Sequence, residues 1–336
     1  MSAPQPLDGI RILDLTRLLP GAYATLMLAD LGAEVVKIED PRGGDGMRTL
    51  RLGSDRPYFE WLNRRKRSVT LDLRSPDAVP VLDALLATAD VVVDSFRPST
   101  ARRLGVDAAT LRARRPSLIC ASIIGFERDG PRAEMPAHDL NYQALAGLLR
   151  PPALPGPLVS DVGAAMQAAV AILAALFERQ RTGDGRALDV TLEGAAAAWS
   201  LFPTTGELES ACYTLYETAD GAWLALAAIE AKFWRGFCEG IERADLIPLQ
   251  HARGAEGERV SAEVRSAMRT RTRDEWLARF AGVDVCLTPV ERPGSPAGVP
   301  PGDSSAPALG ADTDAVLGGV GFDGAARAAL RRQGVI

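Results

Sequence analysis

The 336-residue sequence predicts an α/β protein, with a doubly wound parallel sheet in a large domain and a smaller α+β domain after it. Over residues 1–205, short β-branched runs alternate with helical patterns, which is typical of a parallel sheet covered by helices on both faces. Beyond this stretch, two apolar, aromatic-bearing runs at 211–230 indicate a hairpin. We expect the large domain to begin with 1–205, the small domain to span 206–291, and 292–336 to return to the large domain and end in a helix.

The large domain begins with regular alternation of strand and helix signals. Ser75 is the expected N-cap of a helix whose first position is Pro76, and Gly183 and Gly185 close a long Ala-rich helix. The expected strands are 9–16, 34–40, 67–74, 90–96, 117–126 and 186–192, and the expected helices are 21–33, 75–89, 138–149, 161–185 and 193–202.

The small domain is predicted from fewer signals. Ala219-Asp220-Gly221 is the expected hairpin turn, helical patterns follow at 231–243 and 258–281, and a short strand is expected at 284–290. Residues 292–310 are rich in Pro, Gly and Ser, which indicates a linker or an extended return segment. A closing helix is expected within 325–336.

Composition excludes several classes of function. The net charge of −5 argues against general binding to nucleic acid or anionic membranes, and no uncharged apolar stretch is long enough to span a bilayer. Four dispersed cysteines and two histidines leave almost no ligands for a metal, so we expect no metal site and buried, reduced thiols. No leader with a basic segment before an apolar run is visible, and we expect a cytoplasmic protein.

Common nucleotide and nucleophile motifs are absent. The turn after the first strand, "DLTRLLPGAYA", lacks the GxGxxG fingerprint of dinucleotide-binding domains. Neither a P-loop nor a GxSxG elbow is present. Any cofactor-like ligand must therefore be held in another way.

Basic residues provide one candidate. The cluster "NRRKRS" (63–68) fits a solvated turn before a strand, and only weakly a nuclear-localisation signal. Arg74, Arg97 and Arg103 also follow expected strands, however, and the strand ends of a parallel sheet meet at one edge. Guanidinium groups gathered there would suit a ligand that carries several phosphates.

Four acidic or imidazole residues form the second candidate. His138 and Asp139 precede the helical pattern at 138–149; Asp139 could simply cap that helix, or His138 could move a proton beside an oxyanion held by the helix N-terminus. Asp161 opens the Ala-rich helix, as an N-cap or as an acid, and the small residues after it would let a ligand approach. Glu230 could cap the next helix or orient a histidine.

Several segments resemble the landmarks of the family III CoA-transferases, and the resemblance covers most of the chain. They are "LDGIRILDLTRLLPGAYATLMLADLGAEVVKIEDP" (7–41), "NRRKRSVTLDLR" (63–74), "DSFRPSTARRLGV" (94–106), "ERQRTGDGRALDV" (178–190) and "PALGADTDAVL" (307–317). A narrower set resembles the α-methylacyl-CoA racemase branch: "AHDLNY" (137–142), Asp161, "AAIE" (227–230) and "VCLTPV" (285–290).

The resemblance implies a cofactor-free 1,1-proton transfer at C2 of a 2-methylacyl-CoA through an enolate. His138 and Asp161 would carry the proton on opposite faces, Glu230 would support His138, and the Asp139 N–H would hold the enolate oxygen. It also implies an interlocked homodimer, with each site between the large domain of one subunit and the small domain of the other. The positions that match family contacts to CoA are Arg64, Leu71, Arg74, Phe96, Arg97 and Arg103.

Two other functions stay open at this point. A CoA-transferase would use Asp161 as a nucleophile on the thioester and would need an acceptor acid. A non-catalytic acyl-CoA-binding homologue would bind CoA without exchange or transfer.

Overall fold

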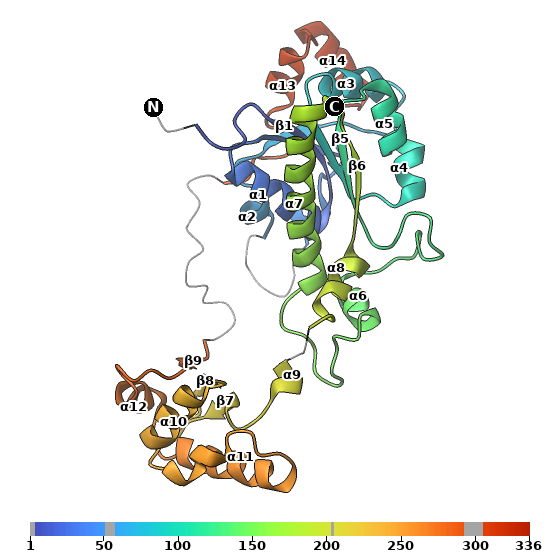
Figure 1. Ribbon diagram of the computed structural model, residues 1–336. Helices are drawn as coiled ribbons and strands as arrows, with labels where there is room; N and C mark the ends of the chain where they lie inside the picture. The colour runs from blue at the N-terminus through green and yellow to red at the C-terminus, as the bar shows by residue number, and fades with distance from the viewer. Residues whose placement is uncertain (1–3, 51–57, 203–204, 292–304) are drawn as a thin grey trace. The chain divides into compact units, whose positions relative to one another are not determined.

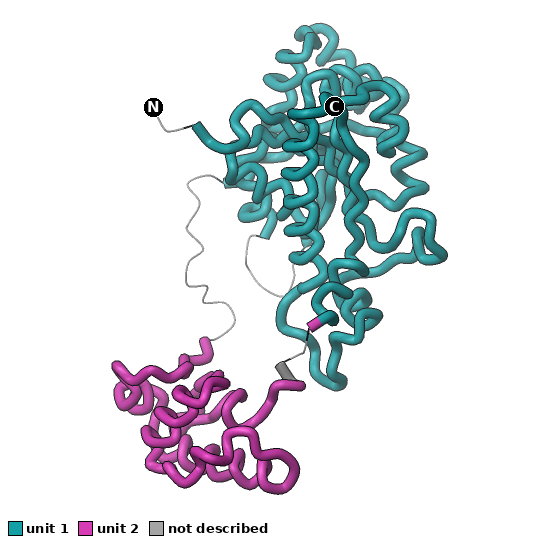
Figure 2. The backbone as a smooth tube through the Cα atoms, in the orientation of Figure 1, with its two compact units in different colours: residues 1–201, 301–336 teal, residues 202–300 magenta. Residues whose placement is uncertain are grey.

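The computed structural model describes residues 4–50, 58–202, 205–291 and 305–336, and these form two compact units. The first unit contains residues 1–201 and 301–336, and the second contains residues 202–300 (Figure 2). The chain therefore leaves the first unit, builds the second, and returns.

A six-stranded parallel sheet forms the centre of the first unit, as predicted. Its order is β3-β2-β1-β4-β5-β6, with parallel pairing throughout. This order reverses between β1 and β4, and doubly wound sheets bind ligands beyond the carboxyl ends of the strands at such a reversal. The strands are β1 Arg11–Leu15, β2 Glu34–Glu39, β3 Arg67–Thr70, β4 Val91–Asp94, β5 Ile119–Ile124 and β6 Ala187–Thr191.

Alternate side chains of these strands enter two separate cores. Ile12 and Val93 pack under α1 and α7, whereas Leu13 and Val92 pack under helices on the opposite face. Figure 1 shows α7 lying along the first of these faces. The first face is covered by α1 Leu18–Asp30 and α7 Val159–Thr182, and the second by α3 Ala78–Leu86, α4 Pro98–Leu104, α5 Ala108–Arg114, α13 Thr313–Gly319 and α14 Gly324–Arg332.

Helix starts are where the structure differs most from the sequence prediction. The helix expected from Ser75 begins at Ala78, because the Ser75 hydroxyl and carbonyl accept the N–H groups of Asp77 and Ala78 in a preceding turn. Short elements not anticipated are α4, α5, α13, α2 Tyr58–Asn63 and the 3-10 turn η1 Gly46–Arg48. The remaining helices of the first unit are α6 Asp139–Leu145 and α8 Leu192–Trp199.

The second unit has the expected hairpin, with a third strand added antiparallel to it. The order is β7-β8-β9, and the turn falls at Ala219-Asp220-Gly221 as predicted. The expected helix at 258–281 is two helices, because Thr272 caps a new one by accepting the N–H of Glu275. The elements are α9 Thr205–Leu208, β7 Tyr213–Glu217, β8 Trp223–Ala227, α10 Ala231–Gly240, η2 Ala244–Leu249, α11 Gly254–Met268, α12 Arg273–Arg279 and β9 Leu287–Pro289.

The last described segment, 305–336, completes the second core of the first unit. Val316, Leu317 and Leu330 are buried in it, and the Asp72 N–H donates to the carbonyl of Val335 at 2.7 Å. The part of the linker prediction that falls on 292–304 lies outside the described residues.

Among the residues that the structure describes, one helix, α7, is long and apolar enough to cross a membrane by length and composition alone. Half of its apolar window is buried, and Ala164, Ala168 and Ile172 are fully buried against the sheet. We therefore describe α7 as a core helix of this unit.

The four cysteines are free thiols in the structure. Cys120, Cys212 and Cys238 are buried free thiols as expected, whereas Cys286 is half-buried. Within the described residues no group of three potential metal ligands occurs.

Candidate active site

A polar pocket of about 220 Å³ lies at the strand-order reversal of the first unit. It is lined by residues that follow β1, β2, β3 and β4, and its cationic side chains are Arg17, Arg74 and Arg103. The Arg17 guanidinium also lies 5.5 Å from the ring centroid of Phe96. Three guanidinium groups and an aromatic ring at one sheet edge suit a phosphorylated nucleotide.

Two aspartates orient the arginine that follows β3. Arg74 Nη2 lies 2.6 Å from Asp40 Oδ2, and its Nε lies 2.9 Å from Asp72 Oδ1. Arg42 pairs with the same two carboxylates. The pKa of Asp40 lies below its usual value: burial opposes this, and hydrogen bonds and charge from Arg42 outweigh it. These pairs are partly solvated, so they set the direction of Arg74 more than they stabilise the fold.

Phe96 is positioned by a buried carboxylate at the end of β4. Asp94 Oδ1 accepts the Phe96 N–H at 3.0 Å, and Oδ2 accepts the Ser122 hydroxyl at 2.6 Å. Burial raises the pKa of Asp94 to about 6. Phe96 itself is 8% exposed and lines the pocket.

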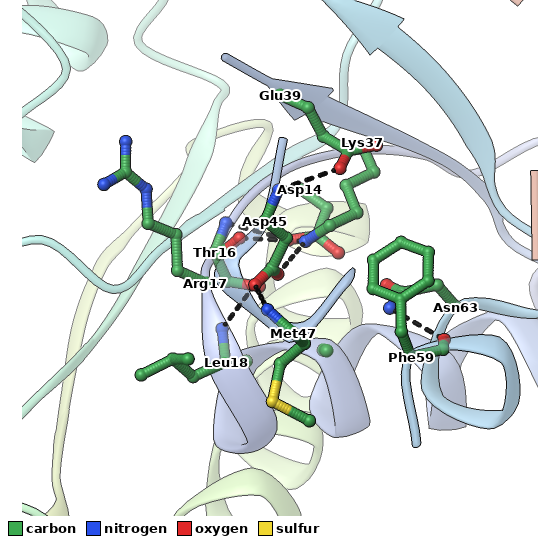
Figure 3. Close-up of polar contacts among 12 residues, drawn as sticks. Asp14, Thr16, Arg17, Leu18, Lys37, Glu39, Asp45, Met47, Phe59 and Asn63 are labelled. Carbon is green, nitrogen blue, oxygen red and sulfur yellow. Dashed lines mark hydrogen bonds and ion pairs between the residues drawn. The ribbon is translucent and has the colours of Figure 1, made fainter. Parts of the chain in front are cut away.

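A fully buried charge cluster lies beside the same pocket, which Thr16 and Asp45 of the cluster also line (Figure 3). Lys37 Nζ lies 2.9 Å from Asp45 Oδ2 and donates to the Thr16 carbonyl at 2.9 Å. Asp45 Oδ1 accepts the N–H groups of Met47 and Leu18. The cluster therefore fixes the loop at 44–47 to the turn that carries Arg17.

A second lysine completes this charge cluster. Lys66 Nζ lies 3.0 Å from Asp14 Oδ2 and also donates to Asn63, Thr25 and the Ala22 carbonyl. Burial opposes ionisation of Asp14, but Lys37 and Lys66 hold its pKa well below the usual range. Burial lowers the pKa of Lys66 to about 8.

The structure brings together most of the residues expected to contact CoA. Leu71, Arg74, Phe96 and Arg103 line the pocket. Arg97 is the exposed N-cap residue of α4, directly after Phe96.

Arg64 is not brought to this pocket. It precedes β3, at the amino edge of the sheet, where its Nη2 lies 2.8 Å from Asp30 at the end of α1. Its guanidinium also lies over the Trp61 ring. Within "NRRKRS", the phosphate-binding interpretation therefore does not hold for Arg64, whereas the Lys66 side chain reaches Asp14 in the charge cluster.

The His138-Asp139 pair lies at the start of α6. His138 is the exposed N-cap residue, and its N–H donates to Asn141 Oδ1 at 3.0 Å. Asp139 is the first helical residue, so no turn of α6 precedes it to accept its N–H. That N–H is free of the helix ladder, as an oxyanion donor requires.

The Asp139 side chain caps a different helix from the one expected. Its Oδ1 accepts the N–H groups of Ser160 at 2.8 Å and Asp161 at 3.1 Å, in the first turn of α7. Asp161 is therefore not the N-cap of α7, which begins at Val159 after Leu158. The Asp139 carboxylate thus ties the start of α6, where His138 lies, to the start of α7, where Asp161 lies.

Asp161 differs from an ordinary surface aspartate. Burial, and then the negative charge of Asp139, raise its pKa to about 7. A carboxyl with such a pKa can hold or release a proton near neutrality, as an acid–base group must.

Tyr142 is a neighbour that the sequence analysis did not single out, although it lies within "AHDLNY". Its hydroxyl donates to the Ala137 carbonyl at 3.3 Å. Burial, and then the charge of Asp161, raise its pKa to about 12, while Arg97 acts in the opposite direction. The pKa of Tyr142 therefore depends on the charges of both Asp161 and Arg97.

The small residues after Asp161 have a packing role instead of the predicted contact with a ligand. A Cβ on Gly163 would lie 3.1 Å from the Trp199 indole nitrogen and 3.6 Å from Ala195, both on α8. Ala164 and Ala165 are fully buried. They allow α7 to approach its neighbours closely.

Glu230 lies in the second unit, where it is exposed at the N-cap position of α10 without a side-chain capping bond. A cavity of about 650 Å³ in the same unit is lined by its neighbour Ile229 and by His251, Arg253 and Arg265. The support expected from Glu230 to His138 stays a prediction.

Comparison with known proteins gives a consistent family assignment. The model of "CoA-transferase family III" matches residues 7–297. A crystal structure of Rv3272 from Mycobacterium tuberculosis aligns with a TM-score of 0.81 and 28% identity, over 93% of this chain and 99% of that one.

Curated relatives include two kinds of enzyme. Human "Alpha-methylacyl-CoA racemase" is 32% identical over 84% of this chain and 77% of its own length. "Succinyl-CoA:mesaconate CoA-transferase" of Haloarcula hispanica is 36% identical over 71% of this chain and 68% of its own length. The identities are similar, so they do not select between racemase and transferase.

Proposed function

This chain is a member of CoA-transferase family III, and on that premise we propose that it is an α-methylacyl-CoA racemase-like enzyme. The proposed substrate is a 2-methylacyl-CoA. The reaction moves the α-proton from one face of C2 to the other through an enolate, with no cofactor besides the CoA carried by the substrate.

One observation carries this proposal: the Asp139 carboxylate bonds to the backbone of Asp161 while Asp139 directly follows His138. The backbone positions that carry the imidazole and the carboxyl group are thus tied to one shared residue. Inversion needs two proton carriers, because a single base that returns its own proton restores the starting configuration.

The proposed reaction has a definite proton balance. Neutral His138 takes the α-proton, the C2 electron pair moves into the thioester to form the enolate, and protonated Asp161 gives its proton to the other face of C2. The reverse inversion starts with protonated His138 and ionised Asp161. The Asp139 N–H stabilises the enolate oxygen, and a donor of this kind is typically worth about 3–4 kcal/mol.

The pocket at the strand-order reversal is the proposed CoA site. Arg74 and Arg103 would contact its phosphates, while Phe96 and Leu71 would contact its less polar parts. Arg97 directly follows Phe96 of this pocket and its charge lowers the pKa of Tyr142, so we propose that it marks the path of the pantetheine chain toward Asp161.

We also propose a homodimer in which the partner's Glu230 supports His138. An exposed apolar row along α7, made of Met166, Val170 and Phe177, supports a partner surface. Sedimentation analysis of the intact chain tests this proposal. A monomer at working concentration would contradict it. Glu230→Gln should weaken α-hydrogen exchange and leave the molar mass of the sedimenting species unchanged.

A reducing, cytoplasmic location is proposed from the thiols. Cys120, Cys212 and Cys238 are buried without disulfide partners. Burial raises the pKa of Cys120 to about 12, so this thiol stays protonated and unreactive.

Deuterium incorporation from D2O into (R)- and (S)-2-methylacyl-CoA tests the proposed reaction. The intact protein should exchange the α-hydrogen and invert C2 without an acceptor acid, and His138→Ala should lose inversion, and exchange of the epimer that faces His138, by about 10²–10⁴-fold. Full inversion by His138→Ala would remove this histidine from the mechanism.

The transferase alternative has a different signature. It would require an acceptor acid, and hydroxylamine would trap Asp161 as a hydroxamate after attack on the thioester. CoA binding with neither exchange nor transfer would instead identify an acyl-CoA-binding homologue.

A further inference from the structure

Two N–H groups in the first turn of α7 bond to the carboxylate of Asp139 and not to that of Asp161, although Asp161 lies in this turn. Asp161 is the third residue of α7, and an acid in the first turn of a helix is ordinarily stabilised in its ionised form by N–H groups and the helix dipole. Here Asp139 accepts the N–H groups of residues 160 and 161. The Asp161 carboxyl therefore lies at the same helix terminus as the Asp139 carboxylate, which is already bonded to two of the N–H groups there.

Gln143 holds Asp139 in this position. Its Nε2 donates to Asp139 Oδ2 at 2.5 Å and to the Pro157 carbonyl at 3.1 Å. Gln143 is 2% exposed and Asp139 is 4% exposed. Because both amide hydrogens have acceptors, the carboxylate is fixed between the loop before α7 and the first turn of α7.

We propose that Asp139, held by Gln143, is the positioning residue that keeps the Asp161 carboxyl in its protonated form. The Asp139 carboxylate accepts three hydrogen bonds, from two N–H groups of α7 and from the Gln143 amide, and a charge on Asp161 would lie beside it. In two neighbouring carboxyl groups, the better-solvated or better-bonded one ionises first. The catalytic meaning of this arrangement rests on the racemase function proposed above.

This arrangement suits a proton carrier better than a nucleophile. A transferase needs Asp161 as a carboxylate that attacks the thioester carbonyl, whereas a racemase needs a proton on Asp161 whenever His138 is neutral. Asp139 therefore contributes to both sides of the reaction, through its N–H at the enolate oxygen and through its side chain at Asp161.

The other charged and titratable groups near this pair act more weakly or indirectly. His138 precedes Asp139, and Tyr142 on α6 is the phenol that responds to Asp161. Arg97 and Glu193, at the starts of α4 and α8, act on Tyr142 with opposite signs. The raised pKa of Asp161, due to burial first and Asp139 second, agrees with the geometric argument.

The test measures the titration of Asp161 in the intact protein by pH-dependent infrared difference spectroscopy, and Asp161→Asn identifies its carboxyl band. Asp139→Asn keeps an oxygen for the α7 N–H groups and removes the charge. The Asp161 midpoint should move to lower pH by about 1 unit. Glu193→Gln is the matched control, because it removes a negative charge nearby without contacting α7 donors, and it should leave the midpoint in place.

Gln143→Met provides a second variant in case Asp139→Asn does not fold. Loss of the amide donors should favour protonation of Asp139 and move the Asp161 midpoint in the same direction by a smaller amount. An unchanged midpoint in a folded Asp139→Asn or, failing that variant, in Gln143→Met would overturn the proposal.

Deuterium exchange on the same variants separates this inference from the proposed function. If Asp139→Asn moves the midpoint but the intact protein shows no exchange, the positioning role stands and the racemase function fails. If exchange occurs and its pH profile in Asp139→Asn follows the infrared shift, both stand.

Discussion

Two groups of buried acids in the first unit have opposite electrostatic environments. Asp14 and Asp45 lie among two lysines, and the pKa of Asp14 stays far below the usual range despite its burial. Asp161 lies beside the like charge of Asp139, and its pKa rises to about 7. In the first group each carboxylate has a lysine partner, and the ion pairs stabilise the fold. In the second group two carboxyl groups lie at one helix end, and the raised pKa of Asp161 suits the proposed proton transfer.

The largest effect should come from removing a cation from the paired cluster. Lys37→Met leaves Asp45 without its ion-pair partner at a position where both side chains are about 1% exposed. We expect about 3–5 kcal/mol lower free energy of unfolding, which a chemical denaturation curve measures. Lys232→Met is the control, because its ion pair with Asp284 is exposed and should be worth little. An equal free energy of unfolding for Lys37→Met and the parent protein would show that the paired cluster does not stabilise the fold.

Removing the acid from the unpaired group should affect the reaction instead of the fold. Asp161→Asn keeps the size of the side chain and cannot carry the proton. We expect inversion at C2 to fall by about 10²–10⁴-fold with an unchanged circular dichroism spectrum, while His138 can still exchange the α-hydrogen of one epimer. Retention of inversion in this variant would show that Asp161 is not one of the carriers.

The same variant should be more stable than the parent protein at alkaline pH. Because the folded pKa of Asp161 is raised from 3.8 to about 7, the folded chain holds this proton at pH values where the unfolded chain has released it. Its stability therefore decreases as pH rises from about 4 to about 7. Asp161→Asn lacks this loss, so it should gain about 1–3 kcal/mol near pH 8 and little near pH 4. Thermal melting at the two pH values measures the difference.

The smallest effect concerns binding at the opposite edges of the sheet. Arg74→Ala should raise the KM for the acyl-CoA by about tenfold, because the variant loses a phosphate-binding guanidinium of the pocket. Arg64→Ala, at the amino edge, should change KM by less than about twofold. Steady-state kinetics on both variants distinguishes them, and a larger effect of Arg64→Ala would place CoA elsewhere.

The sequence predicts the sheet well because its information is local. Six short strands alternate with helical patterns, and each strand lies close to its expected range. Turns that depend on a few local hydrogen bonds, such as the start of α3 and the Thr272 cap, were placed less accurately. The short helices α4 and α13 were missed, because seven residues carry little periodicity.

The site was predicted residue by residue, but not its connections. "AHDLNY" and Asp161 indicated acid–base chemistry, whereas the bond from Asp139 to α7 joins residues 22 positions apart across an irregular loop. The same limit applies to Arg64, since its position depends on the direction of β3. Gln143 could not be recognised, because a buried glutamine in a helical pattern has no sequence signal.

The return of residues 305–336 to the first unit has a consequence for biosynthesis. Backbone N–H groups of strand β3 and of the turn after it donate to Asp312, Thr313 and Val335. The ribosome makes these three residues only after the whole second unit. The nascent chain must therefore keep the apolar surface of α3 and its strands uncovered until translation is almost finished. Expression yield should consequently depend on chaperone supply and on the speed of synthesis through 202–300.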